Sequence, residues 1–147
     1  MTTVLYTARA RAVGGRAGHV ETDDGLLKLD LAPPKALGGA GGKTNPEQLF
    51  AAGYAACFEN AVRHIARQQK LPLTGAAVTA EVSIGPNASG GFQLGVALEA
   101  EIEGLDPSAA EALVAAAHQV CPYSNATRGN IDVGITVKTS QAAGQDA

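Results

Sequence analysis

The chain has 147 residues, a length typical of one domain, and 14 acidic residues against 11 Lys and Arg give it a net charge of −3. With 46 % hydrophobic and 17 % charged residues, it is too apolar for a disordered protein. No apolar run reaches the roughly 18 residues of a membrane span, and the mild acidic excess argues against a nucleic-acid binder. We therefore expect neither a membrane nor a nucleic acid as a partner.

The chain is predicted to be a single domain over residues 1–147, with a polar tail from about residue 139. Residues 1–13 hold no continuous apolar stretch of the kind that a signal peptide needs, so a cytoplasmic location is expected. Small residues dominate, with 29 Ala and 18 Gly, and Trp is absent. Because small side chains bury little apolar area, a monomer would have a thin core, and we expect an intimate homodimer.

The first third of the chain predicts an antiparallel meander. Residues 3–13, 17–22 and 26–31 alternate as in β-strands, and the turn signals Gly14-Gly15 and Asp23-Asp24-Gly25 separate them. The clearest helix signal then follows in Asn45-Pro46-Glu47, which offers an N-cap, a proline at the first helical position and an acidic first turn.

That helix is expected to run from Pro46 to Lys70, where Leu71-Pro72 ends it. A helix this long in so small a protein is predicted to cross the core. Its apolar stripe consists of Phe50, Tyr54, Cys57, Ala61 and Ile65. The adjacent stripe is made of small residues and would let another backbone approach closely: Ala52, Gly53 and Ala56.

The rest of the chain predicts a hairpin with strands over residues 78–84 and 92–102, a helix over residues 107–120 and a last strand over residues 131–137. Almost every connection between strands suits a hairpin. The predicted fold class is therefore α+β, with antiparallel sheets around a long central helix.

Two common kinds of site are argued against. The loop segment GGAGGKT (38–44) is one residue short of the phosphate-binding pattern GxxxxGK[ST], and a meander precedes it instead of a βαβ unit. No metal site is expected, because the chain lacks a CxxC pair and its histidines, His19, His64 and His118, are scattered. We interpret the last two as structural or surface residues.

The two cysteines are the remaining candidates for chemistry. Cys57 lies in the middle of the long helix and gains nothing from the helix N-terminus, so a cation must come to it if it is reactive. Cys121 ends the second helix just before Pro122, where a thiol has room to move toward a partner sulfur. Their number alone equally allows two buried, inert thiols.

Three longer strings resemble one family: GGRAGHV (14–20), LGGAGGKTNPEQLFAAGYAACF (37–58) and VCPYSNATRGN (120–130). They closely resemble the organic hydroperoxide resistance proteins, a group of the OsmC-like superfamily, and the resemblance covers essentially the whole chain. It implies an OsmC-like fold in an intertwined homodimer with two active sites at the interface. It also implies a thiol peroxidase that reduces organic hydroperoxides to alcohols without a bound cofactor or metal. The reductant would be an external dithiol, the dihydrolipoyl group of a lipoylated protein.

The resemblance also implies a role for each of four residues. Cys57 matches the peroxidatic cysteine and Cys121 the resolving cysteine. Arg16 matches the arginine that holds and activates the thiolate, and Glu47 the glutamate that orients this arginine. These roles agree with elementary chemistry, because a guanidinium lowers the pKa of a nearby thiol and can bind a carboxylate at the same time.

Helix geometry constrains where these residues meet. Glu47 and Cys57 are ten positions apart, which corresponds to about 15 Å along one straight helix. Either the helix begins after Glu47, or Arg16 and Glu47 reach Cys57 from the other subunit. We favour the second arrangement.

Aromatic side chains are predicted to line an apolar pocket for the alkyl group, although they would equally suit a plain core: Phe50, Tyr54, Phe92 and Tyr123. Two alternatives to the predicted function stay open. One is a peroxidase of the osmotically induced branch of the same superfamily. The other is a non-catalytic dimeric carrier of an apolar ligand.

Overall fold

The computed structural model of the chain describes residues 3–140, so the predicted polar tail lies outside the described residues from position 141 onward. The chain divides into two compact units, Met1–Leu49 and Phe50–Ala147. Each contains a three-stranded sheet, and helices accompany the second sheet, which confirms the α+β class. The single domain over residues 1–147 stays a prediction.

The first unit contains the predicted antiparallel meander, formed by β1 (Ala10–Val13), β2 (His19–Thr22) and β3 (Lys28–Asp30). A 3-10 turn, η1 (Gly15–Ala17), connects β1 to β2. Gly14 has φ 87° and begins this turn, a backbone conformation that favours glycine because it has no Cβ.

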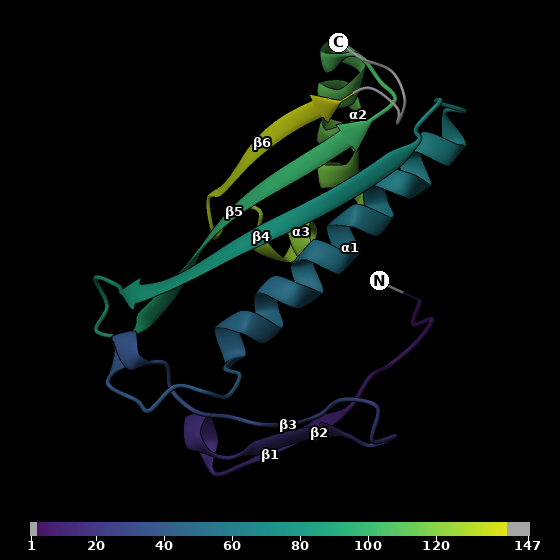
Figure 1. Cartoon of the computed structure of the whole chain (residues 1–147). Helices are drawn as coiled ribbons and strands as arrows, with labels where there is room; N and C mark the ends of the chain where they lie inside the picture. Colours follow the sequence, from purple (N-terminus) through teal and green to yellow (C-terminus); the bar gives the residue numbers. More distant parts are fainter. Residues whose placement is uncertain (1–2, 141–147) are drawn as a thin grey trace. The chain divides into compact units, whose positions relative to one another are not determined.

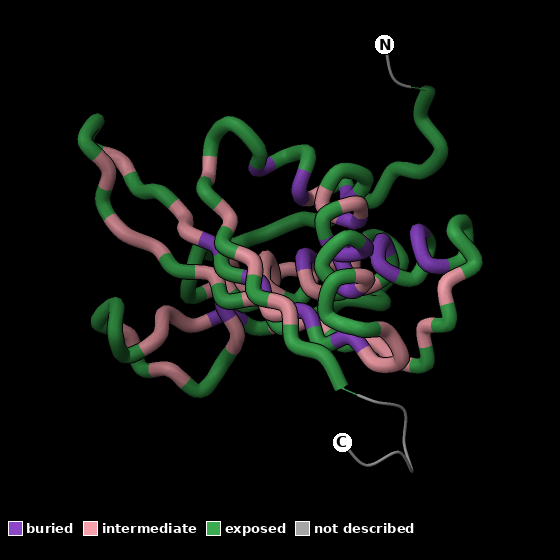
Figure 2. The backbone as a smooth tube through the Cα atoms, turned by 90° about the horizontal axis from the view of Figure 1, so that it is seen from above, coloured by how far each residue is buried: buried purple, intermediate pink, exposed green. Residues whose placement is uncertain are grey.

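The first and third strands are shorter than predicted. The strand expected over residues 3–13 begins only at Ala10, because its partner β2 ends at Thr22 and a turn follows. The Asp23 N–H of that turn still donates to the Arg9 carbonyl, but the strand ladder does not continue beyond it. These residues are exposed, as the stretch next to the N label in Figure 2 shows. Leu31, predicted to end the third strand, instead forms an isolated bridge to Thr44. The loop between these two residues contains a second 3-10 turn, η2 (Lys35–Leu37).

Helix α1 (Pro46–Gln68) begins where the sequence places it and ends two residues earlier than predicted. The Asn45 Oδ1 atom accepts a hydrogen bond of 2.9 Å from the Gln48 N–H, which confirms the N-cap. At the other end, Lys70 adopts a φ of 54° and the Leu71 N–H bonds back to the Ala66 carbonyl, which closes the last turn.

The second unit is built on a sheet in the order β4-β5-β6, with β4 (Gly75–Pro86), β5 (Phe92–Glu103) and β6 (Val133–Ser140). β4 and β5 form the predicted hairpin, but β6 pairs with β5 in parallel. The expectation of purely antiparallel sheets is therefore wrong for this sheet. The reason is the connection: the chain crosses through two helices between β5 and β6, and such a crossover joins parallel strands.

The crossover consists of α2 (Pro107–Val120) and α3 (Pro122–Thr127). α2 matches its predicted range, and the Asp106 Oδ1 atom caps it by accepting a hydrogen bond of 2.8 Å from the Ala109 N–H. α3 was not predicted. Its proline occupies the first helical position, and Cys121 is at once the C-cap of α2 and the N-cap of α3.

The core of the second unit lies between the helices and one face of its sheet (Figure 1). The apolar stripe of α1 is buried there, which confirms that the long helix enters the core. The largest fully buried side chains come from α1, β5 and α2: Tyr54, Phe58, Val62, Leu98, Ile102, Leu113 and Val114. The opposite face of the sheet carries polar residues, among them exposed Glu81 and Lys138 and half-buried Glu99.

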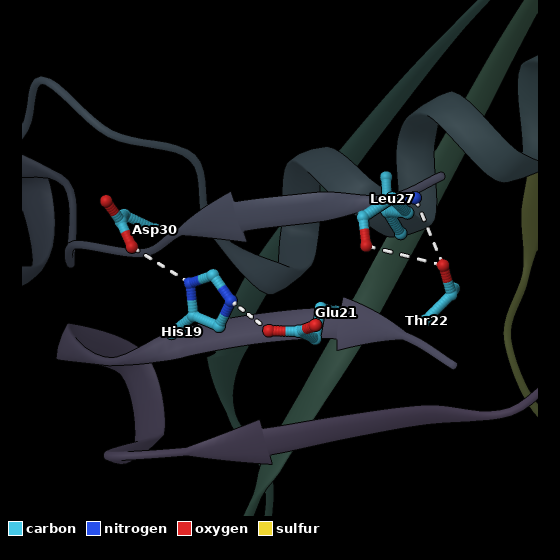
Figure 3. A network of polar contacts seen from close by, with 5 residues as sticks. All are labelled: His19, Glu21, Thr22, Leu27 and Asp30. Carbon is cyan, nitrogen blue, oxygen red and sulfur yellow. Dashed lines mark hydrogen bonds and ion pairs between the residues drawn. The ribbon is translucent and has the colours of Figure 1, made fainter. Parts of the chain in front are cut away.

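A histidine between two carboxylates links the strands of the first sheet (Figure 3). His19 Nδ1 lies 2.9 Å from Asp30 Oδ1 on β3, and His19 Nε2 lies 2.9 Å from Glu21 Oε1 on its own strand. The hydrogen bond to Asp30, followed by that to Glu21, raises the pKa of His19, and the same bond lowers the pKa of Asp30. The imidazolium form, which donates at both nitrogens, is therefore favoured in the folded protein.

This arrangement predicts a pH-dependent contribution to stability. Because the folded pKa of His19 is raised, its contribution is complete below the ordinary histidine pKa of about 6.5 and is lost as the pH rises through the folded value. The variant His19→Gln should therefore lose more stability relative to wild type at about pH 5.5 than at about pH 8. Urea unfolding of both proteins at the two pH values and at low salt measures this difference. An equal loss at both pH values would contradict the prediction.

Candidate active site

Arg16 and Glu47 form a two-pronged ion pair within the first unit. Arg16 Nη1 donates to Glu47 Oε1 at 2.6 Å, and Nη2 donates to Glu47 Oε2 at 2.9 Å. Arg16 is presented by the turn η1, and Glu47 by the first turn of α1. The structure thus brings together two of the four predicted residues, which lie 31 positions apart in the sequence.

This pair is charged and leaves part of the guanidinium available. The hydrogen bonds from Arg16 hold the pKa of Glu47 below its ordinary value, and Glu47 raises the pKa of Arg16. The Glu47 side chain is only 13 % exposed, whereas that of Arg16 is 41 % exposed. A guanidinium has five N–H donors and Glu47 uses two, so Arg16 retains donors for an anion. The Glu47 carboxylate fixes the plane of the Arg16 guanidinium and leaves some of its N–H groups unbonded to Glu47.

Cys57 and Cys121 meet in the second unit. The Cys121 Sγ atom lies 3.7 Å from the Cys57 Sγ atom, and both thiols are free. Cys57 is half-buried on α1, and Cys121 is fully buried between α2 and α3. The two sulfurs are therefore in contact, and an approach of under 2 Å would bring them to the length of a disulfide bond. Cys121 lies at the helix end as predicted, but it is packed in the core instead of being free to move.

The surroundings of Cys57 disfavour its thiolate form. Burial raises the pKa of the Cys57 thiol, a hydrogen bond from the Tyr123 backbone N–H lowers it in part, and neighbouring Cys121 raises it further. No cation enters this balance among the described residues. The sequence predicts that a reactive Cys57 needs a cation brought close to it. Within the second unit taken alone, this need is not met.

Comparison with known proteins identifies the family. Residues 39–136 match the family model described as "OsmC-like protein". The organic hydroperoxide resistance protein of Xanthomonas axonopodis pv. citri is 54 % identical over 136 residues, which cover 91 % of this chain and 95 % of that protein. The chain belongs to the OsmC-like family.

Two solved structures of family members are similar along the same length. A crystal structure from Legionella pneumophila, titled an organic hydroperoxide resistance protein OsmC, has a TM-score of 0.90 and 64 % identity, over 92 % of this chain and 99 % of that one. A structure titled a putative organic hydroperoxide resistance protein from Vibrio cholerae, with captopril bound in one of its active sites, has a TM-score of 0.89 and 58 % identity, over 92 % and 93 %. The resemblance stated from the sequence is thereby confirmed.

Three of the four predicted pocket residues cluster beside the cysteines of this OsmC-like chain. Phe50, Tyr54 and Tyr123 make edge-on or tilted ring contacts, with centroids 5.5–6.3 Å apart. Tyr54 is fully buried, whereas Phe50 and Tyr123 are half-buried. Phe92 forms no aromatic pair within residues 3–140, and at the start of β5 it is 75 % exposed.

Tyr123 also explains a glycine in the middle of α1. A Cβ added to Gly53 would lie 2.5 Å from the Tyr123 hydroxyl oxygen, closer than real contacts allow. The small-residue stripe therefore has a specific use at this position, because the Tyr123 side chain lies against it. Ala52 and Ala56 of the same stripe are exposed.

Sequence reasoning missed one polar cluster next to the thiols. His118, interpreted as a structural or surface residue, places its Nδ1 atom 2.8 Å from the Ser124 Oγ atom, and Tyr54 Oη lies 2.8 Å from the same oxygen. The unpredicted helix α3 carries Ser124, and Tyr54 is 70 positions away. No local pattern in the sequence could have joined these residues.

Two kinds of feature are absent from residues 3–140. Within residues 3–140 no group of three or more His, Cys, Asp or Glu side chains is placed to hold a metal ion. In the same range, every helix is too short or too polar to span a bilayer. The cytoplasmic location stays a prediction.

The contact at Gly53 predicts that a single methyl group will change thiol reactivity. The variant Gly53→Ala gains helix propensity of about 1 kcal/mol, but its new methyl group must displace the Tyr123 ring. We expect this displacement to disturb the Tyr123 backbone N–H that stabilises the Cys57 thiolate. We expect a higher Cys57 pKa and a slower reaction with iodoacetamide at neutral pH. The pH dependence of alkylation measures both. Ala52→Ser, on the exposed side of the same helix, is the matched control, and equal alkylation in all three proteins would refute the prediction.

Proposed function

We propose that this chain is a thiol-dependent peroxidase that reduces organic hydroperoxides to alcohols. The observation that carries the proposal is the pair of free thiols in contact, one half-buried and one fully buried, beside an aromatic cluster. The names of relatives at 54 % and 64 % identity support the peroxide as substrate and favour the organic hydroperoxide branch over the osmotically induced branch.

The proposed cycle uses both sulfurs. The Cys57 thiolate attacks the distal peroxide oxygen, the O–O bond breaks, and the leaving alkoxide takes up a proton to become the alcohol. Cys57 is left as a sulfenic acid. The Cys121 thiol then attacks the Cys57 sulfur, which forms the disulfide and releases water. Phe50 and Tyr123 are proposed to contact the alkyl group through the parts of their rings that are accessible. Buried Tyr54 is proposed to pack behind these two rings. Phe92 receives no role in this proposal.

An external dithiol returns the enzyme to its reduced form. One thiolate of the dithiol attacks a sulfur of the disulfide, and its second thiol closes a ring and releases both cysteines. We propose that the attack falls on Cys57, because Cys121 is fully buried. The proposed reductant is the dihydrolipoyl group of a lipoylated protein, on the family resemblance alone. The cycle calls for neither a metal nor a bound cofactor.

Arg16 is proposed to supply the positive charge that Cys57 lacks in its own surroundings. A guanidinium beside the sulfur lowers the thiol pKa, and Glu47 keeps that guanidinium oriented. α1 begins at Pro46, so the alternative in which the helix starts after Glu47 is excluded. We therefore propose that the partner subunit's Arg16 and the partner subunit's Glu47 complete the site around Cys57.

A homodimer is part of this proposal. Large apolar side chains of the N-terminal segment are exposed to a degree that a stable monomer rarely shows, with Val4 at 73 %, Leu5 at 95 % and Tyr6 at 81 %. A second copy of the chain would cover such a surface. It would also add buried apolar area, of which the many Ala and Gly residues supply little.

The thiol chemistry predicts a simple stoichiometry. One equivalent of cumene hydroperoxide should remove two free thiols and two hydrogens in mass from the reduced protein, faster than hydrogen peroxide does. Cys57→Ser should abolish the loss, and Cys121→Ser should stop at a single oxygen added to Cys57. Intact mass and thiol titration provide the measurement. If both thiols stay free in the wild type, the peroxidase proposal fails and the ligand-carrier alternative takes its place.

The shared site predicts complementation between inactive variants. Arg16→Ala and Cys57→Ser should each be inactive, but a randomly exchanged mixture should recover about a quarter of wild-type activity, because half of the dimers regain one of two sites. Mixing Arg16→Ala with Glu47→Gln is the matched control. It should recover nothing, since the Arg16–Glu47 bond forms within one chain. Recovery in neither mixture, with subunit exchange verified by mass, would place Arg16 and Cys57 of one site in the same subunit.

A further inference from the structure

The segment over residues 121–127 is held in place by contacts outside itself. It contains the buried Cys121 and the helix α3, which has only six residues. A helix this short is not stable alone, because helix formation needs a costly first turn and α3 adds few bonds after it. The position of the Cys121 sulfur relative to Cys57 therefore depends on what anchors α3.

The anchor is a group of three buried hydroxyls and one half-buried imidazole from three helices. The Ser124 Oγ atom of α3 lies 2.8 Å from Tyr54 Oη on α1 and 2.8 Å from His118 Nδ1 on α2. Thr127 Oγ1 lies 3.3 Å from the same Tyr54 hydroxyl and donates to the Ser124 carbonyl. Tyr54 and Ser124 are fully buried and Thr127 is 2 % exposed. We call Tyr54, Ser124, Thr127 and His118 the hydroxyl anchor.

A second tie closes the far end of the segment. Arg128, which follows α3, donates from Nη2 to the His118 carbonyl and from Nη1 to Asn125 Oδ1. Burial and the neighbouring Arg128 charge both lower the pKa of His118, so its ring is neutral at physiological pH and carries one acceptor nitrogen. The Ser124 hydroxyl can then donate to His118 Nδ1 while it accepts from Tyr54 Oη, which satisfies all three groups.

The anchor stands next to the thiols along the chain. Ser124 follows Tyr123, whose backbone N–H bonds to Cys57, and lies three positions after Cys121. Hydrogen bonds are directional, so they fix the rotation and register of α3 where apolar packing alone would allow alternatives. Burying polar groups in a core costs free energy unless they are hydrogen-bonded, as the groups of the hydroxyl anchor are.

We propose that the hydroxyl anchor positions Cys121 for the resolution step, so that the disulfide forms before a second peroxide reaches Cys57. This inference rests on the proposed peroxidase function. Two reactions compete for the sulfenic acid of Cys57. Attack by the Cys121 thiol gives the disulfide and water, whereas attack on a second hydroperoxide transfers one more oxygen, giving a sulfinic acid and an alcohol. The first reaction is favoured by holding the thiol close, and the loss of about 1 Å in alignment is enough to slow it markedly.

The experiment measures the partition between these two products. Reduced Ser124→Ala, Tyr54→Phe and His118→Leu are treated with one to one hundred equivalents of cumene hydroperoxide, quenched, and analysed by intact mass. The disulfide lowers the mass by two hydrogens, and the sulfinic acid raises it by two oxygens. We expect Ser124→Ala to need about tenfold less peroxide than wild type for half-conversion to sulfinic acid, while consumption of the first equivalent changes by no more than about threefold.

Conservative and distant variants separate positioning from folding. His118→Asn keeps a polar atom near the position of Nδ1 and should restore most of the wild-type partition, whereas His118→Leu should not. Ser108→Ala, an exposed serine in the first turn of α2, should match wild type. If Ser124→Ala does not fold, Tyr54→Phe, which keeps its ring, and His118→Leu, at a half-buried position, carry the test.

The outcomes are distinguishable. If wild-type protein loses no thiols to peroxide, the proposed function itself fails. If the wild type cycles and the anchor variants form disulfide as completely as it does at every peroxide dose, the positioning role is overturned. That role is also overturned if His118→Asn and His118→Leu overoxidise equally, because the effect would then come from packing and not from the hydrogen bond.

Discussion

The packing of α1 against β5 and α2 is the interaction on which the unit Phe50–Ala147 depends. The apolar stripe of α1 is buried along most of its length in this unit, and β5 and α2 supply the facing side chains. Because Cys121 is the C-cap of α2 and the N-cap of α3, the same packing brings it against Cys57, 64 positions away. A thiol in the middle of a helix and a thiol at a helix junction thus become neighbours through apolar burial, and their chemistry depends on the core.

This placement creates an electrostatic problem. A sulfur in a half-buried position is a poor thiolate, and burial together with Cys121 raises the pKa of Cys57 against the single backbone N–H that lowers it. The first unit contains a group suited to solving that problem, a guanidinium fixed by two hydrogen bonds to a carboxylate and still part-exposed. In the proposed function the activating charge and the nucleophile come from different units, so the reactivity of Cys57 would depend on assembly of the complete protein.

The second constraint is that polar side chains buried in the apolar core must be hydrogen-bonded. Tyr54, Ser124 and Thr127 have almost no exposed surface, yet within residues 3–140 no buried side-chain nitrogen or oxygen lacks a hydrogen-bond partner. Satisfying these groups requires α1, α2 and α3 to hold one relative arrangement, and Gly53 permits it by leaving space for Tyr123. Directional bonds and close contacts therefore add a constraint on these three helices to the one that apolar packing imposes.

The sequence by itself determined the local features of this protein, because their causes are local. Asn45 and Asp106 cap helices through atoms three residues away, and the alternation of residues 78–84 and 92–102 predicts their hairpin. The strings around Cys57 and Cys121 are long enough to indicate the family, which the comparisons confirm. Only the tertiary structure decided the parallel pairing of β6, the late start of the first meander strand and the presence of α3. Likewise, the bond between Ser124 and His118 and its extension to Tyr54 depend on how three helices pack, and no pattern along the chain records that packing.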